Sequence, residues 1–341
     1  MKTKFQRELE EKSRGTLFNP AFERDSCGTG FVANISGKPS HEIVEKGIEA
    51  VVNLTHRGAF SADAATGDGA GILIQIPRKF FKKELESLGH HKVEVDTLAV
   101  GMIFFPRHNY QGRERARAII EDVVSRHKMK GSSWRIVPVD SSVLGEKAEN
   151  TRPEIEQVLI VPKTKKSFAS EDAYERALYL ARNEIEKKID EESIEDFYIP
   201  SFSSRTLVYK GLLVAPQLKK FYIDLNDPDL ESAVALFHQR YSTNTFPNWY
   251  LAQPFRFLGH NGEINTLQGN RNWMKAREAE LDHPFWGKKI DFLKPVVVPG
   301  GSDSAGLDNA LELLVQSGRS LIHSMMMLVP EAWENMPQMD P

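Results

Sequence analysis

The sequence has a single cysteine, Cys27, among 341 residues. One cysteine excludes an internal disulfide, a zinc site made of thiolates and an iron–sulfur cluster held by cysteines of this chain. The ten histidines show no H-x-x-x-H or similar spacing that would place two metal ligands on one helix face. We therefore expect no metal site in this chain.

Long hydrophobic runs and a charge excess of either sign are also missing. No apolar run approaches the ~20 residues of a membrane span. The net charge of −3 gives no basic surface for nucleic acid or anionic lipid. Residues 1–20 mix Lys and Arg with Glu and have no apolar core, unlike a secretory signal. These absences predict a cytoplasmic protein with neither a nucleic-acid nor a membrane partner.

The one thiol stands among small residues in "ERDSCGTGFVANI", and three interpretations compete. A free cysteine is commonly a buried core residue at the start of a strand. Residues 28–33 also match G-x-G-x-x-A, but a dinucleotide site needs a strand before that motif and a helix after it. Here a polar segment with Pro20 precedes the motif and a strand-like run follows, which disfavours that site. The third interpretation is a catalytic nucleophile, which depends on the rest of the chain.

Apolar patterning beyond Cys27 predicts blocks of strands with helices between the blocks. Regular alternation of strand and helix is absent, which argues against a doubly wound parallel sheet. We expect one domain with insertions over 27–341, preceded by a polar extension over 1–26. The predicted strands are 28–36, 69–77, 97–106, 135–140, 154–163, 197–204, 205–213, 221–226 and 233–242. The predicted helices are 40–58 and 170–192, each with a serine N-cap, and 265–281 and 302–318.

Several polar segments each have an ordinary structural explanation when taken alone. Asn261-Gly262 is a typical hairpin turn, and Asp303 suits a helix N-terminus. Arg57 and Arg240 could be solvated surface residues. The glycine-rich segment 58–71 lacks the lysine of a phosphate-binding P-loop.

Taken together, these segments are similar to one family. The motifs are "DSCGTGFVA", "LTHRGA", "TGDGAGI", "HQRYSTNTFPNW", "GHNGEINT" and "GGSDSAGLDN". In this order and spacing, the chain from Cys27 onward resembles the class II (N-terminal nucleophile) glutamine amidotransferase domain of glutamate synthases. The resemblance implies an α+β fold, a four-layer αββα sandwich of two mainly antiparallel sheets.

The resemblance also implies that Cys27 becomes the first residue after cleavage from Ser26, so that 1–26 is a propeptide. A free α-amine has a pKa near ~8 and a thiol near ~8.5, so the new terminus would supply the base for its own nucleophile. Cys27 would attack the side-chain amide of L-glutamine, and ammonia would leave. Water would then hydrolyse the γ-glutamyl thioester to glutamate.

Two further groups of residues take their roles from the same resemblance. The Asn261 side-chain amide and the Gly262 N–H, expected to be unpaired in its turn, would stabilise the oxyanion. Arg57 would orient the Cys27 terminus.

At the other end of glutamine, Arg240 would bind the carboxylate and Asp303 the ammonium. Ser242 and Thr243 would line this part of the site.

Glutamate synthases also contain a part that binds FMN and an iron–sulfur cluster and uses ammonia to make glutamate from 2-oxoglutarate. This chain holds neither cofactor on this view and represents the glutaminase half, as a truncated fragment or as a subunit with a synthase partner. Two alternatives remain open: an amidotransferase with a different acceptor, and a non-catalytic glutamine-sensing module.

Overall fold

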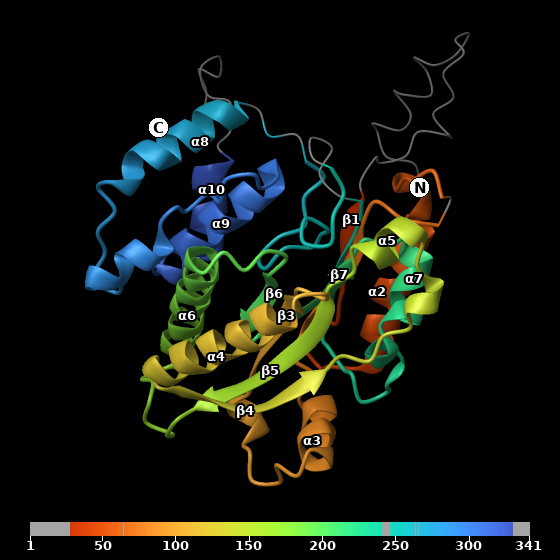
Figure 1. The fold of residues 1–341 in the computed structure, drawn as a ribbon, viewed down its shortest axis with the longest axis horizontal. Coiled ribbons are helices and arrows are strands. Elements are labelled where there is room, and N and C mark those ends of the chain that lie inside the picture. Colours follow the sequence, from red (N-terminus) through yellow and green to blue (C-terminus); the bar gives the residue numbers. More distant parts are fainter. Residues whose placement is uncertain (1–27, 64, 241–245, 263, 265, 330–341) are drawn as a thin grey trace.

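The computed structural model describes residues 28–63, 65–240, 246–262, 264 and 266–329. Within them the strands form two four-stranded antiparallel sheets (Figure 1). The first sheet consists, in spatial order, of β1 (Thr29–Ala33), β8 (Val234–Gln239), β2 (Ala70–Gln75) and β7 (Thr206–Gly211). The second consists of β4 (Met129–Ile136), β5 (Glu154–Pro162), β3 (Ala99–Phe105) and β6 (Tyr198–Ser203).

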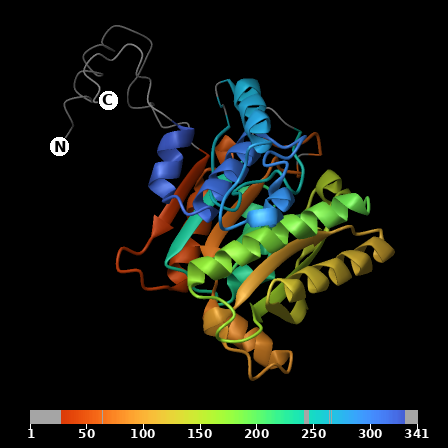
Figure 2. The same ribbon diagram turned by 90° about the vertical axis from the view of Figure 1, so that its left-hand side faces the viewer.

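Helices cover both sheets. Their bounds are α2 (His41–Asn53), α3 (Arg78–Ser87), α4 (Tyr110–Arg126), α5 (Glu146–Asn150), α6 (Glu171–Glu191), α7 (Ala215–Phe221), α8 (Leu267–Glu278), α9 (Asp303–Gln316) and α10 (Leu321–Leu328). Helix α2 packs on β8, β1 and β2, whereas α4 packs on β4 and α6 on β6. Helices α4 and α6 also contact one another, as both views of the ribbon show (Figure 1 and Figure 2). Helix α9 packs against α6 and α10.

The alternation of side chains along β3 shows that the second sheet is buried on both faces. Val100, Met102 and Phe104 enter a large apolar cluster that also takes residues from the first sheet, α2, α3 and α7. Ala99, Ile103 and Phe105 enter a second cluster with α4 and α6. Because successive residues of a strand point to opposite faces, one strand contributes to two cores. Helices therefore lie outside a pair of sheets, and the α+β class expected from the sequence is confirmed.

Most of the predicted elements are present, but the strand predicted over 221–226 is wrong. Phe221 ends α7, and Ile223–Asn226 is a 3₁₀ helix. The buried Asp224 explains this geometry, because its carboxylate accepts two hydrogen bonds from the Arg135 guanidinium, at 2.7 and 2.8 Å. The 3₁₀ turn and the end of α7 before it bury Phe221, Asp224 and Leu225 together.

The strand predicted over 135–140 is displaced, since β4 ends at Ile136 and begins at Met129. It is an edge strand with a partly exposed, polar first half, so its apolar pattern is weak there. Helices α3, α4, α5, α7 and α10 were not predicted from the sequence. Buried residues 116, 119, 120 and 123 of α4 follow the helical period, and the Asn109 side chain caps it by accepting the Gly112 N–H at 2.8 Å.

None of the helices in the described part of the chain is long and apolar enough to cross a lipid bilayer. The predicted propeptide, residues 1–26, lies outside the described residues.

Candidate active site

The C-terminal end of β8 brings three motif segments together. The Gln239 N–H donates to the Gly28 carbonyl at 2.7 Å, and the Arg240 N–H donates to the Gly69 carbonyl at 2.7 Å. Since β8 lies between β1 and β2, these bonds extend the sheet on both sides of one strand end. Arg240 is therefore close to Gly28, the residue that follows Cys27 in the sequence.

The backbone of Arg240 is strained. Its φ is 99°, a value that residues with a side chain rarely adopt. Such conformations persist where the surrounding structure holds them, and they concentrate at functional sites. Here the hydrogen bond to Gly69 holds the main chain at the point where the arginine leaves the sheet.

The Asn261 side chain forms a hydrogen bond to Gly28, the residue after Cys27. Its Oδ1 accepts the Gly28 N–H at 2.9 Å, across 233 residues of sequence. The N–H can only donate, so the oxygen of the side-chain amide must face Gly28 and its NH₂ group must face away. This orientation is the one that the proposed oxyanion donor requires.

Gly262 differs from the sequence-based expectation. Its φ of 79° lies in the region that favours glycine, which explains the residue type at this turn. Its N–H is not unpaired, however, since it donates to His260 Nδ1 at 3.1 Å. The residue is also buried. The expectation of an exposed, unpaired N–H is therefore wrong: the local turn satisfies this donor with the imidazole two residues earlier.

Asp303 lies in the first turn of α9 and is 2% exposed. The preceding Ser302 is the N-cap, and its Oγ accepts the Ala305 N–H at 3.1 Å. Asp303 Oδ1 accepts the Ser304 N–H at 2.7 Å. A carboxylate is stabilised at this end of a helix by the helix dipole. Asp303 is thus a buried, oriented carboxyl group rather than the cap itself.

Asp68, in the glycine-rich segment, is also a buried carboxyl group, and it lies near Arg240. It is 5% exposed, and no donor among the described residues reaches either oxygen with good hydrogen-bond geometry. Burial raises the pKa of Asp68 to about 6, although the main-chain N–H of Ala59, the Arg240 charge and the Gln239 side chain oppose the rise. Gly58 packs tightly against the side chains of Asp68 and Gln239. A Cβ at this position would lie 2.1 Å from Gln239 Nε2 and 3.0 Å from Asp68 Oδ1.

Several predicted residues are brought together, and others cannot be placed. Arg240, Asn261 and Gly262 meet near Gly28 at the strand end, as described above. Arg57 ends the 3₁₀ helix Thr55–Arg57, half-buried and next to Gly58 in the chain. Cys27, Ser242 and Thr243 lie outside the described residues. The roles of all these residues in binding or catalysis stay predictions.

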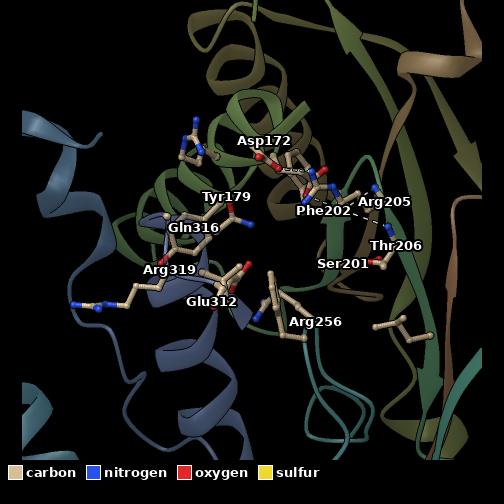
Figure 3. Close-up of a pocket in the computed structure, with 18 of the residues that line it drawn as sticks. Asp172, Tyr179, Ser201, Phe202, Arg205, Thr206, Arg256, Glu312, Gln316 and Arg319 are labelled. Atoms are coloured by element: carbon tan, nitrogen blue, oxygen red, sulfur yellow. Dashed lines mark hydrogen bonds and ion pairs between the residues drawn. The ribbon is translucent and has the colours of Figure 1, made fainter. Parts of the chain in front are cut away.

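Sequence reasoning did not single out His238, Gln253 and Ser304, which all hydrogen bond around His260. His238 and Gln253 lie within or next to the quoted motifs, and their spacing gave no signal of their contacts. A cavity of about 470 Å³ between α6, β6 and α9 contains none of the predicted site residues. Figure 3 shows Tyr179, Arg256 and Glu312 on its walls.

Comparison with known proteins assigns the chain to a family. The family model of the class-II glutamine amidotransferases matches residues 27–341. The chain belongs to the class-II glutamine amidotransferases. Its match begins at Cys27, the single cysteine.

Among curated relatives of this amidotransferase domain are large chains of glutamate synthases. The chain is 49% identical over 315 residues to the glutamate synthase [NADPH] large chain of Azospirillum brasilense, which covers 92% of this chain and 20% of the relative. It is 48% identical over 316 residues to ferredoxin-dependent glutamate synthase 2 of Synechocystis sp., with the same coverage. It is 42% identical over 322 residues to the large chain of Bacillus subtilis, covering 94% and 21%. The chain thus spans about a fifth of the length of these relatives.

Proposed function

We propose that this chain is the glutaminase part of a glutamate synthase, which hydrolyses L-glutamine to glutamate and ammonia. The observation that carries the proposal is the hydrogen bond between Gly28 and Asn261, because it joins the segment of the expected nucleophile to the expected oxyanion donor. Similarity to glutamate synthases over more than nine-tenths of the chain supports this branch of the family.

In the proposed reaction, the Cys27 α-amine takes the thiol proton and the sulfur attacks the side-chain amide carbon of glutamine. The C–N bond breaks, and the nitrogen leaves as ammonia with that proton. Water then adds to the γ-glutamyl thioester, which releases glutamate and restores the thiol. The Arg240 guanidinium would bind the substrate carboxylate, and Asp303 would bind its ammonium, with Ser242 and Thr243 as polar lining.

The tetrahedral intermediates carry an oxyanion that the Asn261 NH₂ group and the Gly262 N–H would stabilise. The Gly262 N–H donates to His260 Nδ1 in this structure, and one N–H makes only one strong hydrogen bond. The oxyanion would therefore have to displace the imidazole as acceptor. Arg57 is proposed to orient the Cys27 terminus.

The released ammonia would serve a synthase partner, as a further part of the same protein or a separate subunit. FMN and an iron–sulfur cluster would belong to that partner. For the cluster the reason is that this chain has a single cysteine, whereas a cluster is held by several. We place the protein in the cytoplasm, without a nucleic-acid or membrane partner.

The test combines mass spectrometry of the purified protein with an ammonia-release assay. We expect loss of residues 1–26, ammonia and glutamate in equal amounts, and no ammonia from Cys27→Ala. Protein that keeps residues 1–26 and still releases ammonia at full rate would contradict the role of the new terminus. Processed protein that binds glutamine and releases no ammonia would favour the glutamine-sensing alternative.

A further inference from the structure

The side chain of Gln253 binds the main chain of His260 at both of its polar groups. Gln253 Nε2 donates to the His260 carbonyl at 2.7 Å, and Gln253 Oε1 accepts the His260 N–H at 2.9 Å. Gln253 is fully buried, so water does not compete for these bonds. A primary amide that pairs with one residue in this way holds it as a neighbouring strand would.

A second buried side chain supports the same carbonyl. His238, on β8 and 1% exposed, has Nε2 3.1 Å from the His260 carbonyl oxygen. Burial lowers the pKa of His238 to about 4, so the ring is neutral at physiological pH. Because the carbonyl can only accept, a hydrogen bond to it requires the tautomer with the proton on Nε2. The carbonyl thus accepts from two side chains on different elements. We call Gln253, His238 and the His260 main chain the clamp.

The segment that carries Gln253 is itself anchored at two places. The main-chain carbonyl of Gln253 lies over β2, where a Cβ on Gly71 would be 2.6 Å from the carbonyl oxygen. Four and five residues after Gln253, the N–H groups of Phe257 and Leu258 donate to the buried Asp308 carboxylate of α9 at 2.8 and 3.1 Å. The clamp is therefore attached to the sheet and to α9.

His260 connects to the oxyanion turn and to the proposed ammonium site. It directly precedes Asn261, which bonds to Gly28. Its Nδ1 accepts the Gly262 N–H at 3.1 Å and lies 3.3 Å from Ser304 Oγ. Ser304 in turn donates its N–H to Asp303. Displacement of the His260 main chain would move Asn261 and Gly262 relative to the nucleophile.

We propose that Gln253 is a positioning residue for glutamine hydrolysis, because its amide fixes His260 and thereby sets the place of the two oxyanion donors. The inference rests on the proposed function. Gln253 itself touches no reacting atom, and it acts through the turn at Asn261-Gly262. A shift of about 1 Å in catalytic groups can cost about 100-fold in rate.

The test compares Gln253→Met with Gln157→Met. Both glutamines are fully buried and both amides are hydrogen bonded, but Gln157 bonds to Arg135 and Tyr209. Methionine keeps the length and removes the hydrogen bonds in each case. We expect Gln253→Met to lower kcat for ammonia release by about 10- to 100-fold with KM for glutamine within about two-fold. We expect Gln157→Met to leave kcat within about two-fold, although it lowers the Tm.

Amide hydrogen exchange at His260 tests the clamp without any activity. The His260 N–H should exchange faster in Gln253→Met than in the wild type. In Gln157→Met its exchange rate should equal that of the wild type. Unchanged exchange in Gln253→Met, or faster exchange with full kcat, would overturn the inference. A rise in KM at constant kcat would overturn it too, since it would assign Gln253 to substrate binding.

Two further outcomes separate the clamp from the proposed function. If wild-type protein releases no ammonia, the proposed function and the role in its reaction fail, and exchange at His260 still reports whether the clamp exists. If Gln253→Met does not fold, Gln253→Asn replaces it, because asparagine keeps the amide but is one methylene shorter, so it cannot reach both the His260 N–H and the His260 carbonyl. The same fall in kcat is expected there, and an unchanged kcat would overturn the inference.

Discussion

Asn261 Oδ1 accepts a hydrogen bond from the Gly28 N–H, 2.9 Å away, and this contact sets the direction of the side-chain amide. The oxygen is committed to the first residue after Cys27, so the NH₂ group points elsewhere. The residue that we propose as an oxyanion donor is thereby held at a fixed distance from the segment that follows Cys27. This one bond makes the oxyanion hypothesis specific enough to test.

Asn261→Asp retains the acceptor for Gly28 and removes the NH₂ donors. We expect kcat for ammonia release to fall by about 10²- to 10³-fold with little change in KM, as for the loss of one oxyanion donor. Steady-state kinetics with glutamine measure both constants. A large rise in KM with unchanged kcat would instead make Asn261 a substrate-binding residue.

Arg240→Lys tests the recognition of the substrate carboxylate. Lysine keeps the positive charge but cannot bind a carboxylate through two parallel N–H groups. We expect KM for glutamine to rise by about 10- to 100-fold, with a smaller effect on kcat. Arg115→Lys is the control, since Arg115 is exposed and pairs with Glu192 at the surface. Equal kinetics for the two variants would rule out the proposed role.

Gly58→Ala tests the tight packing next to Arg57. The new Cβ would lie 2.1 Å from Gln239 Nε2 and 3.0 Å from Asp68 Oδ1, so these buried side chains must move. We expect a loss of about 1–3 kcal/mol of stability, measured by denaturant unfolding. At Gly131 a Cβ would meet only Val158, at 4.0 Å, so Gly131→Ala should change stability by less than about 1 kcal/mol. A tolerated Gly58→Ala would show that this packing is looser than described.

The sequence predicts helices and strands best where one face is uniformly buried. Tyr174, Leu178, Ala181, Ile185 and Ile189 mark one face of α6, and all five are buried in the core as expected. The segment 221–226 shows the opposite case. Its apolar residues suit a strand or a turn. The turn forms because Asp224 pairs with Arg135 from another part of the chain. No local pattern carries that contact.

The candidate site was predictable to a similar extent. The motifs indicated Asn261, Gly262, Arg240 and Asp303, and the structure brings their segments together. The connections between them could not be read from the sequence, because they run through His260 side-chain and main-chain bonds to Gln253 and Ser304. For the same reason the pairing of the Gly262 N–H was missed. Turn propensity describes the backbone, whereas this donor is satisfied by a side chain.

Asp68 gives a prediction for the pH dependence of stability. Its pKa is about 6 in the folded protein, against 3.8 for an unperturbed Asp side chain. Between these values the unfolded chain loses the proton and the folded protein keeps it, so this group lowers stability as pH rises from about 4 to about 6. Asn cannot ionise. The Tm of Asp68→Asn relative to wild type should therefore increase over that range and stay level above it.

Asp63, in the same segment, should show the opposite trend. Hydrogen bonds from the Thr66 hydroxyl and from backbone N–H groups lower its pKa, so its stabilising effect is present at neutral pH and is lost as pH falls through the acidic range. The Tm of Asp63→Asn relative to wild type should therefore decrease as pH rises. This change falls below about pH 4, since an unperturbed Asp has a pKa of 3.8, whereas the change for Asp68→Asn falls between about pH 4 and 6. Thermal unfolding of the three proteins from about pH 2 to 7 makes the comparison, and trends common to all of them cancel. If Asp68→Asn followed Asp63→Asn, Asp68 would have to be ionised in the folded protein across this range, and burial would not control its pKa.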